Sequence, residues 1–237
     1  MNGWLKNAAA LAVGLVFACV VGEGVVRMFL SDEIVLFPRF HTDAHYGDYV
    51  LRRLRPNTEF THRSIDGIWE FHTNNKGFRD FEPYQYEKPK GQIRVLVLGD
   101  SHTEGFEVRQ DHTFSHLLRK ILRLKGLKAQ VLNTGVSGFS TAEELVFLEQ
   151  EGVKYSPDVV VVGFFANDFS DNLKAGLFRL KDGYLVESSR NHIPGVKYLN
   201  VINEIGLFRW LSQHSYFYSF VFNGVWNLAK KALLTKA

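Results

Sequence analysis

The stretch VLVLGDSHTEGFEV covers residues 95–108, and within it a run of strand-forming residues stops at Gly99-Asp100-Ser101. The run IRVLVLG, residues 93–99, is apolar at nearly every position, as is typical of a strand covered on both faces. A glycine, a carboxylate and a hydroxyl at the end of such a strand leave three interpretations of Ser101. It is a nucleophile, a phosphate-binding hydroxyl or a helix cap, and the rest of the chain has to decide between them.

From this strand onward, the sequence predicts an alternation of strands and helices. Residues 113–126 predict a helix that Gly126 ends, and AQVLNTG, residues 129–135, predicts a second strand. Ser140 and Glu143 predict a capping box for a helix over 141–152, and a third apolar strand follows at 158–165. The apolar stripe expected on the first helix consists of Phe114, Leu117, Leu118, Ile121 and Leu124. Short links between these elements indicate a parallel sheet with right-handed crossovers.

After the third strand this alternation ends. FRLKDGYLVE, residues 178–187, predicts a small hairpin on Asp182-Gly183, and residues 205–234 predict helix with a break at Asn223-Gly224. Since no fourth strand is predicted, the third strand lies beside an unpaired edge, or the sheet stays at three strands. An unpaired edge favours aggregation, so we expect a poorly soluble or unstable chain.

The N-terminal segment predicts a membrane anchor. Residues 7–22 carry no charge. This segment is shorter than the roughly 20 residues that a membrane span needs, but the apolar character resumes after Glu23. Glu23 and Arg27 are four residues apart and can pair on a continuing helix. An uncleaved signal anchor is the favoured interpretation, because no small-x-small cleavage site precedes a polar stretch.

Three other interpretations of this segment stay open: a cleaved signal peptide, a lipoprotein signal ending at Cys19, and a buried core helix. Lys6 precedes the segment, and Arg27 and Arg39 follow it, so the charge asymmetry is weak. We expect the domain to lie on the periplasmic or extracytoplasmic side of an inner membrane.

Between the anchor and the first parallel strand lies an extension. Residues 61–72 predict a hairpin on Asp66-Gly67, Asn74 to Gly77 predict a turn, and residues 86–92 predict a linker. The expected organisation is a membrane anchor over residues 1–30, the extension over 31–90 and an α/β domain over 91–237.

Composition excludes several classes of protein. With 46% apolar and 22% charged residues in 237, the chain is long and apolar enough for a folded core. A net charge of +3 from 28 basic and 25 acidic residues is too balanced to indicate a nucleic-acid partner. His41, Asp43 and His45 alternate and would share one face of a strand, but an exposed polar segment is favoured over a metal site. The sequence predicts no metal and no cofactor.

Three loops follow the three parallel strands, and ligands of such sheets bind at the carboxyl ends of the strands. Ser101 comes first, and its N–H lies at a helix entrance, where donors without partners favour an anion. Gly138 in the second loop lets a backbone N–H approach a ligand, and Asn167 in the third offers an amide donor. A hydroxyl nucleophile among such donors is what acyl transfer needs.

These loops resemble a known family. Gly99-Asp100-Ser101, NTGVSG (133–138) and FFANDFSD (164–171) resemble blocks I, II and III of the SGNH/GDSL hydrolases in order and spacing. The N-terminal segment, NNKGFR (74–79) and the run over 155–172 are similar to the membrane-anchored bacterial members.

The resemblance covers roughly residues 70–175 and implies a flavodoxin-like three-layer αβα fold with a parallel sheet. It implies hydrolysis of a carboxylic ester with Ser101 as the nucleophile. It also implies an oxyanion hole made by the N–H groups of Ser101 and Gly138 and the side chain of Asn167. Members of the family act on lipids, acetylated sugars, thioesters and other acyl compounds.

The chain departs from the family pattern in two places. Phe165 replaces a glycine of block III, and no aspartate is followed three residues later by a histidine, as block V requires. We therefore expect the C-terminal part of the domain to be missing and the chain to be a truncated or inactive form. The histidines considered as a substitute base, none of them favoured by the sequence, are His102, His112, His116, His192 and His214.

Four functions follow from these observations. The first is a membrane-anchored esterase or acyl hydrolase with a lipid, glycan or small-molecule ester as substrate. The second is an inactive acyl-binding remnant, and the third an O-acetyltransferase or deacetylase of envelope polysaccharide. A nucleotide or phosphate binder is disfavoured, because the chain has no G-x-G-x-x-G and no Gly-Lys-Ser/Thr. The uncharged tail, residues 210–229, is interpreted as an amphipathic packing helix rather than a second span.

Overall fold

The computed structural model describes residues 3–36, 40–191, 201–202 and 205–234. The chain divides into two compact units, which are described one at a time. The first consists of residues 1–38, 62–68 and 205–237, and the second of residues 39–61 and 69–204.

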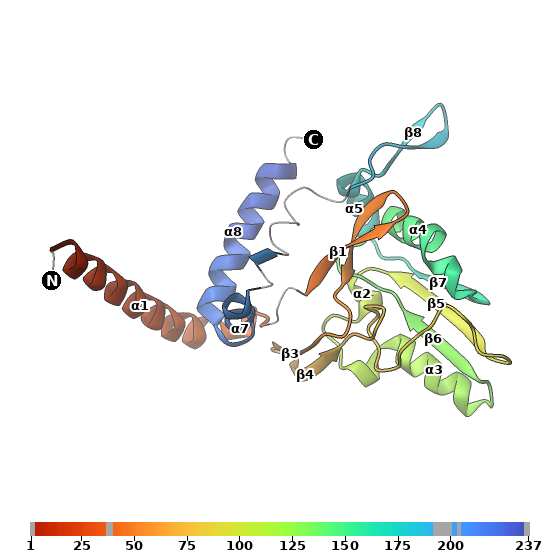
Figure 1. Ribbon diagram of the computed structural model, residues 1–237, viewed down its shortest axis with the longest axis horizontal. Coiled ribbons are helices and arrows are strands. Elements are labelled where there is room, and N and C mark those ends of the chain that lie inside the picture. Colours follow the sequence, from red (N-terminus) through yellow and green to blue (C-terminus); the bar gives the residue numbers. More distant parts are fainter. Residues whose placement is uncertain (1–2, 37–39, 192–200, 203–204, 235–237) are drawn as a thin grey trace. The chain divides into compact units, whose positions relative to one another are not determined.

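A parallel sheet forms the centre of the second unit (Figure 1). Its strands are β5 (Ile93–Gly99), β6 (Ala129–Asn133) and β7 (Val159–Gly163), in the order β6-β5-β7. Both strand pairs are parallel, with Val95 opposite Val131 on one side and Val159 on the other. The predicted parallel sheet is confirmed, and among the described residues no further strand pairs with β7.

Helices cover both faces of the central strand β5. Val95, Val97 and Val131 form a buried cluster against which Leu118 and Leu122 of α3 (Phe114–Leu124) pack. Leu96 alternates to the opposite face, where it lies close to Gly152 after α4 (Thr141–Gln150). The result is the expected αβα layering, and the Ser140–Glu143 capping box that begins α4 is present.

The predicted apolar stripe of α3 is largely wrong. Phe114, Leu117, Ile121 and Leu124 are 41–78% exposed, and only Leu118 of the five packs against the sheet cluster. The buried positions of α3 are Ser115 and Arg119. The inner face of the helix is partly polar because a buried ion pair, rather than leucine alone, fastens it to the rest of the unit.

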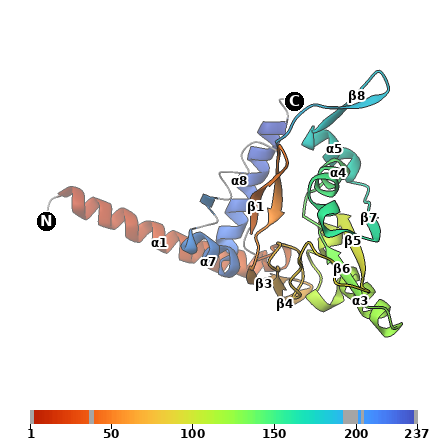
Figure 2. The same ribbon diagram turned by 45° about the vertical axis from the view of Figure 1, so that its right-hand side comes forward.

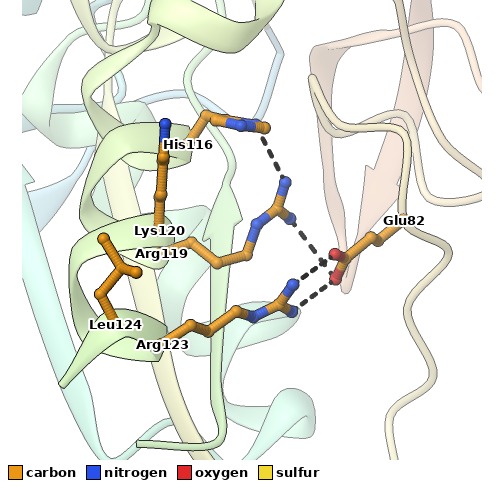
Figure 3. A pocket seen from close by; sticks show the side chains of 6 residues that line it. All are labelled: Glu82, His116, Arg119, Lys120, Arg123 and Leu124. Atoms are coloured by element: carbon orange, nitrogen blue, oxygen red, sulfur yellow. Dashed lines mark hydrogen bonds and ion pairs between the residues drawn. The ribbon is translucent and has the colours of Figure 1, made fainter. Parts of the chain in front are cut away.

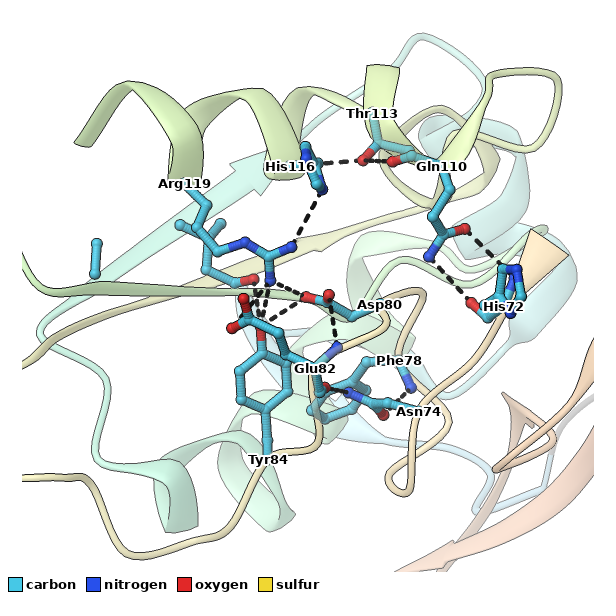
Figure 4. A network of polar contacts seen from close by, with 12 residues as sticks. His72, Asn74, Phe78, Asp80, Glu82, Tyr84, Gln110, Thr113, His116 and Arg119 are labelled. Carbon is cyan, nitrogen blue, oxygen red and sulfur yellow. Dashed lines mark hydrogen bonds and ion pairs between the residues drawn. The ribbon is translucent and has the colours of Figure 1, made fainter. Parts of the chain in front are cut away.

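That ion pair belongs to a network of polar contacts that includes side chains between Asn74 and Tyr84 (Figure 4). Arg119 Nη1 lies 2.5 Å from Asp80 Oδ2 and 2.9 Å from the hydroxyl of Tyr84, which itself donates to Asp80 over 2.6 Å. Asn74 accepts from the backbone N–H of Phe78 and donates to the carbonyl of Glu82. The predicted turn at residues 74–77 is confirmed, because the N–H of Gly77 donates to the carbonyl of Asn74.

Small hairpins precede and follow the three parallel strands along the chain, and one of them includes residues of both units. β1 (His41–Tyr46) pairs antiparallel with β2 (Tyr49–Leu54), and β8 (Phe178–Lys181) pairs with β9 (Tyr184–Glu187) on the predicted Asp182-Gly183 turn. β3 (Glu59–Ser64) and β4 (Gly67–His72) form the predicted hairpin, with its turn at residues 65–66, one residue before the predicted position. Short helices complete the unit: α2 (Ser101–Glu104), η2 (Gln110–His112), η3 (Gly152–Tyr155) and α5 (Asp168–Ala175).

In the first unit, α1 (Gly3–Phe29) and η1 (Ser31–Glu33) are joined by α7 (Gly206–His214) and α8 (Tyr216–Leu234). The end of α1 and the start of α8 lie side by side (Figure 1 and Figure 2). Glu23 pairs with Arg27 over 2.7 Å, as predicted, and accepts from Ser215 Oγ and the N–H of Phe217. The helical tail therefore breaks at Ser215, where Glu23 supplies the acceptors, and not at the predicted Asn223-Gly224, which lies inside α8.

Within the described part of the chain, α1 is the one helix long and apolar enough to cross a membrane. By length and composition it fits a signal sequence equally well. Val26 is its only buried residue, so the alternative of a buried core helix is wrong. The alternative of a second span in the tail receives no support, since α8 does not meet the same criterion.

Candidate active site

Ser101 is the first residue of α2, immediately after β5. The cap of this helix is Asp100, whose side chain accepts from the N–H of His102 over 2.8 Å, so the interpretation of Ser101 as a helix cap is wrong. Gly105 ends the helix in the left-handed conformation with φ 73°. The sequence GDSHTEG therefore folds as a strand end, a cap, one helical turn and a stop.

The ends of β5 and β7 are glycines because α2 folds back over them. Gly99 and Gly163 lie opposite each other in the sheet, and the side chain of Thr103 packs against both. A Cβ atom at either glycine would overlap the Thr103 hydroxyl. The strand stops at a glycine so that the turn carrying Ser101 can lie on the end of the sheet.

The second loop, between β6 and α4, is bound to the same short helix. Asn133 Nδ2 donates to the carbonyl of Thr103 over 2.9 Å, and the N–H of Ser137 donates to Glu104 Oε2 over 2.5 Å. Gly135 packs directly against the backbone of Thr103 and Glu104. Gly138 follows with φ +80° and is exposed at the surface of this loop.

The third loop, between β7 and α5, is bound to the residue before Ser101. Asn167 Nδ2 donates to Asp100 Oδ2 over 3.1 Å and to Asp171 Oδ2 over 2.8 Å. Ionised carboxylates only accept hydrogen bonds, so the NH2 group of the Asn167 amide, and not its oxygen, faces Asp100 and Asp171. Both amide hydrogens of Asn167 are thus engaged, and an oxyanion would have to displace a carboxylate to receive one of them.

The structure thus places Ser101, Gly138 and Asn167 in three loops at one end of the sheet, connected through Asp100 and α2. Among the described residues, the N–H groups of Ser101 and Gly138 and the hydroxyl of Ser101 have no hydrogen-bond partner. Two backbone donors and one hydroxyl are therefore available at this end. Their roles in catalysis remain predictions.

One histidine belongs to these loops. His102 Nδ1 lies 3.2 Å from Asp100 Oδ1, and its ring lies against Phe165 with ring centroids 3.9 Å apart. The Asp100 carboxylate favours the tautomer with hydrogen on Nδ1, leaving Nε2 as the acceptor on a side chain that is 58% exposed. No hydrogen bond joins His102 to Ser101 within the described ranges.

The other histidines lie elsewhere. His116 Nδ1 lies 3.2 Å from Arg119 Nη2, and burial together with that guanidinium lowers the pKa of His116. His112 is exposed beside Asp111, and His214 is in the first unit, where its Nδ1 contacts the carbonyl of Trp210. His192 lies outside the described residues.

Buried carboxyl groups lie behind the loops, a feature that the sequence did not reveal. Both carboxylate oxygens of Glu144 on α4 are buried and have no hydrogen-bond partner among the described residues. Burial, together with the nearby charges of Asp168 and Asp100, raises the pKa of Glu144 to about 8. Burial likewise raises the pKa of Glu104 to about 7 and, with a contribution from Asp100, that of Asp168. Glutamates at these helix positions are ordinarily exposed, so only the packing reveals them.

A pocket beside α3 is a weaker candidate (Figure 3). Its lining includes three cations, but Arg123 donates both of its terminal nitrogens to Glu82, and Arg119 pairs with Asp80 and Glu82. Only Lys120 offers a charge without an ion pair among the described residues. His41 and Asp43 share β1, but nowhere in the described ranges do three His, Cys, Asp or Glu residues form a group that could hold a metal.

Comparison with known proteins identifies the family of these loops. The model of the GDSL-like lipase/acylhydrolase family matches residues 97–222. An arylesterase of Vibrio mimicus is 33% identical over 75 residues, which are 32% of this chain and 38% of the arylesterase. The crystal structure of AlinE4, an SGNH-hydrolase family esterase, is 28% identical with a TM-score of 0.30, as is a mutant of it. These matches cover 35% of this chain and 45% of AlinE4, so the chain spans less than half the length of either relative.

Proposed function

The chain belongs to the GDSL-like lipase/acylhydrolase family, and from that membership we propose that it is a serine esterase or acyl hydrolase. The observation that carries the proposal is the meeting of three strand-end loops around Ser101, with unengaged N–H groups on Ser101 and Gly138. Its substrate is a carboxylic ester of a lipid, a glycan or a small molecule.

In the proposed reaction, the Ser101 oxygen attacks the carbonyl carbon of the ester. Negative charge then develops on the carbonyl oxygen, and the N–H groups of Ser101 and Gly138 stabilise it. Asn167 supplies a third donor once its amide turns from Asp100 to the oxyanion. Collapse of the tetrahedral intermediate expels the alcohol and leaves an acyl ester on Ser101, which water hydrolyses.

The reaction needs a base for the Ser101 proton. Among the described residues, His102 is the histidine in these loops whose Nδ1 is held by a carboxylate. That arrangement orients an imidazole as the histidine–aspartate half of a catalytic triad does. We propose His102 as the base of this chain, acting through Nε2 when substrate binds.

A second candidate is an acyl-binding protein without turnover. It is favoured by one observation: no hydrogen bond joins Ser101 to a histidine among the described residues. Transfer of the acyl group to a sugar hydroxyl instead of water is a variant of the first candidate, because both share the acyl-enzyme step.

Labelling by a fluorophosphonate probe tests the proposal, with the full chain purified in detergent. The proposal predicts labelling of the wild type that is lost in Ser101→Ala and reduced at least tenfold in His102→Gln. Ser188→Ala, which removes an exposed hydroxyl after β9, is the matched control and should label as the wild type does. Weak labelling in all four proteins would support the acyl-binding alternative.

We also propose that α1 anchors the protein in a membrane, with the second unit on the extracytoplasmic side. Its length and apolar composition support this proposal. Cell fractionation followed by protease treatment of intact spheroplasts tests it. Recovery of a shortened soluble chain would show instead that the segment is a cleaved signal.

A further inference from the structure

The turn that carries Gly138 is held from both sides. Residues 136–139 form a tight turn closed by a 2.9 Å hydrogen bond from the N–H of Phe139 to the carbonyl of Val136. Gly138 occupies its third position with φ +80°, as a type II turn requires. The N–H of Val136 donates to the carbonyl of Gly99 over 3.1 Å, so the turn begins at the end of β5.

The first holding contact comes from α2. Glu104 is 0% exposed, and its Oε2 accepts the N–H of Ser137 over 2.5 Å. Among the described residues this is the only hydrogen bond of the Glu104 carboxylate, whose other oxygen is buried without a partner. Ser101 begins the helix that Glu104 ends, so a single helical turn carries the nucleophile and a support of the turn.

The second holding contact comes from the N-terminal hairpin. Arg52 on β2 donates from Nη2 to the carbonyl of Gly138 over 2.6 Å. The same guanidinium lies directly against the Gly138 Cα, where an added Cβ would come within 2.8 Å of Nη2. The positive φ favours glycine at this position, and a side chain there would also displace the Arg52 guanidinium.

We propose that Arg52 and Glu104 are positioning residues that hold the Gly138 N–H toward the carbonyl oxygen of the ester attacked by Ser101. The inference rests on the proposed function. Glu104 holds the peptide group before this N–H, and Arg52 holds the peptide group after it. The donor between them is kept in place without a hydrogen bond of its own, which leaves it available to an oxyanion.

The expected effect follows from how strictly an oxyanion donor must be placed. Loss of one such donor lowers kcat by about 10²–10³, and a displacement of about 1 Å costs up to about 10². Arg52→Met removes one of two supports, so we expect kcat to fall by about tenfold with KM within about twofold of the wild type. Glu104→Ala should act in the same direction, whereas Glu104→Gln keeps an acceptor for the Ser137 N–H and should stay within about threefold.

The test combines two measurements on the full chain in detergent. Hydrolysis of p-nitrophenyl acetate gives kcat and KM, and amide hydrogen exchange reports the segment 134–140. Arg53→Met is the matched control, because Arg53 neighbours Arg52 on the same strand and has no hydrogen bond to this turn among the described residues. We expect faster exchange over 134–140 in Arg52→Met and Glu104→Ala, with unchanged exchange over β5 showing that the fold is intact.

Each outcome decides the inference. Faster exchange with a lower kcat supports it, and wild-type kcat or wild-type exchange in Arg52→Met overturns it. If Arg52→Met raises KM for an anionic ester but not for p-nitrophenyl acetate, Arg52 binds substrate and does not hold the turn. If the wild type hydrolyses nothing, the proposed function fails, and exchange over 134–140 still decides whether Arg52 and Glu104 hold the turn.

Discussion

Two neighbouring strands with similar sequences have opposite environments. β5 and β7 are both runs of branched apolar residues, yet Val97 on β5 is 0% exposed and Val162 on β7 is 53% exposed. β5 has a strand on each side, and its two faces pack against residues of α3 and α4. β7 has β5 on one side and, among the described residues, no strand on the other. Apolar composition identifies a strand, but burial depends on what the rest of the chain places around it.

Polar groups strengthen the same contrast. On the covered side, Arg94 at the start of β5 is fully buried and donates to the carbonyls of Tyr86 and Tyr155. The buried ion pair between Arg119 and Asp80 connects α3 to the segment that precedes the sheet. Around β7, the polar contacts of the described residues lie at the strand's start, where Asp158 accepts from Lys88 Nζ and from the N–H of Arg94. The covered side should therefore carry most of the stability of the second unit.

The largest expected effect comes from breaking that buried pair. Asp80→Ala leaves the buried Arg119 with Glu82, at 3.5 Å, as its one ion-pair partner among the described residues. Losing one partner of a buried pair costs about 3–5 kcal/mol. Urea unfolding of the full chain in detergent measures the change. The double variant Asp80→Ala/Arg119→Met should lose less than Asp80→Ala alone, because no unpaired charge then remains buried.

The control for this prediction is Lys154→Gln, which removes an ion pair with Glu151 at the surface. An exposed pair contributes about 0–1 kcal/mol. A loss of less than about 1 kcal/mol in Asp80→Ala would show that the network around Arg119 does not carry the stability of the covered side.

The strands themselves allow a matched pair of variants. Val97→Ala and Val162→Ala remove the same two methyl groups, from β5 and from the exposed β7. We expect a loss of about 2 kcal/mol for Val97→Ala and about 0.5 kcal/mol or less for Val162→Ala. Equal losses in urea unfolding would mean that β7 is as well covered as β5 and would remove the comparison.

Sequence reasoning recovered what depends on neighbouring residues in the chain. The three strands, the Ser140–Glu143 capping box and the Asp182-Gly183 turn each follow from local patterns, and the structure confirms them. What it missed depends on distant residues. The inner face of α3 was misassigned because its anchor is Arg119, whose partner Asp80 lies 39 positions earlier.

The candidate site divides in the same way. The three loops with Ser101, Gly138 and Asn167 could be located from sequence, because the ends of parallel strands share one edge of a sheet. Three features of the site could not be located from sequence: the helix cap at Asp100, the hydrogen bonds of Asn167 to two carboxylates, and the contacts that hold the Gly138 turn. Arg52 lies 86 positions before Gly138 on a hairpin strand, and no local pattern connects the two.

A pH dependence should arise where the ends of β5 and β7 meet. Glu144 has its pKa raised to about 8 by burial and by Asp168, Asp100 and Glu143, against 4.5 as its ordinary value. Below pH 4.5 both folded and unfolded chains hold the proton; as pH rises toward 8 the unfolded chain releases it first, and stability is lost. Glu144→Gln should therefore be more stable than the wild type at pH 8, by on the order of 1 kcal/mol, with no difference near pH 4.5.

Thermal unfolding as a function of pH measures this difference. Glu149→Gln is the control, since Glu149 lies on the same helix with an exposed side chain. A constant offset between Glu144→Gln and the wild type at every pH would contradict the assignment of the effect to the titration of Glu144.

The smallest effect on stability, and the most direct test of the exposed strand, comes from a charge on β7. Val160 is 40% exposed, and a lysine on an edge strand opposes pairing with the edge of another molecule. Val160→Lys should change the free energy of unfolding by about 0.5 kcal/mol or less while lowering the self-association seen by light scattering. Leu185→Lys adds the same charge to exposed β9 and should leave association unchanged, because it does not touch the β7 edge. If both lysines lower association equally, net charge controls association and the open edge of β7 does not. β5 and β7 would then differ in burial but not in their tendency to associate.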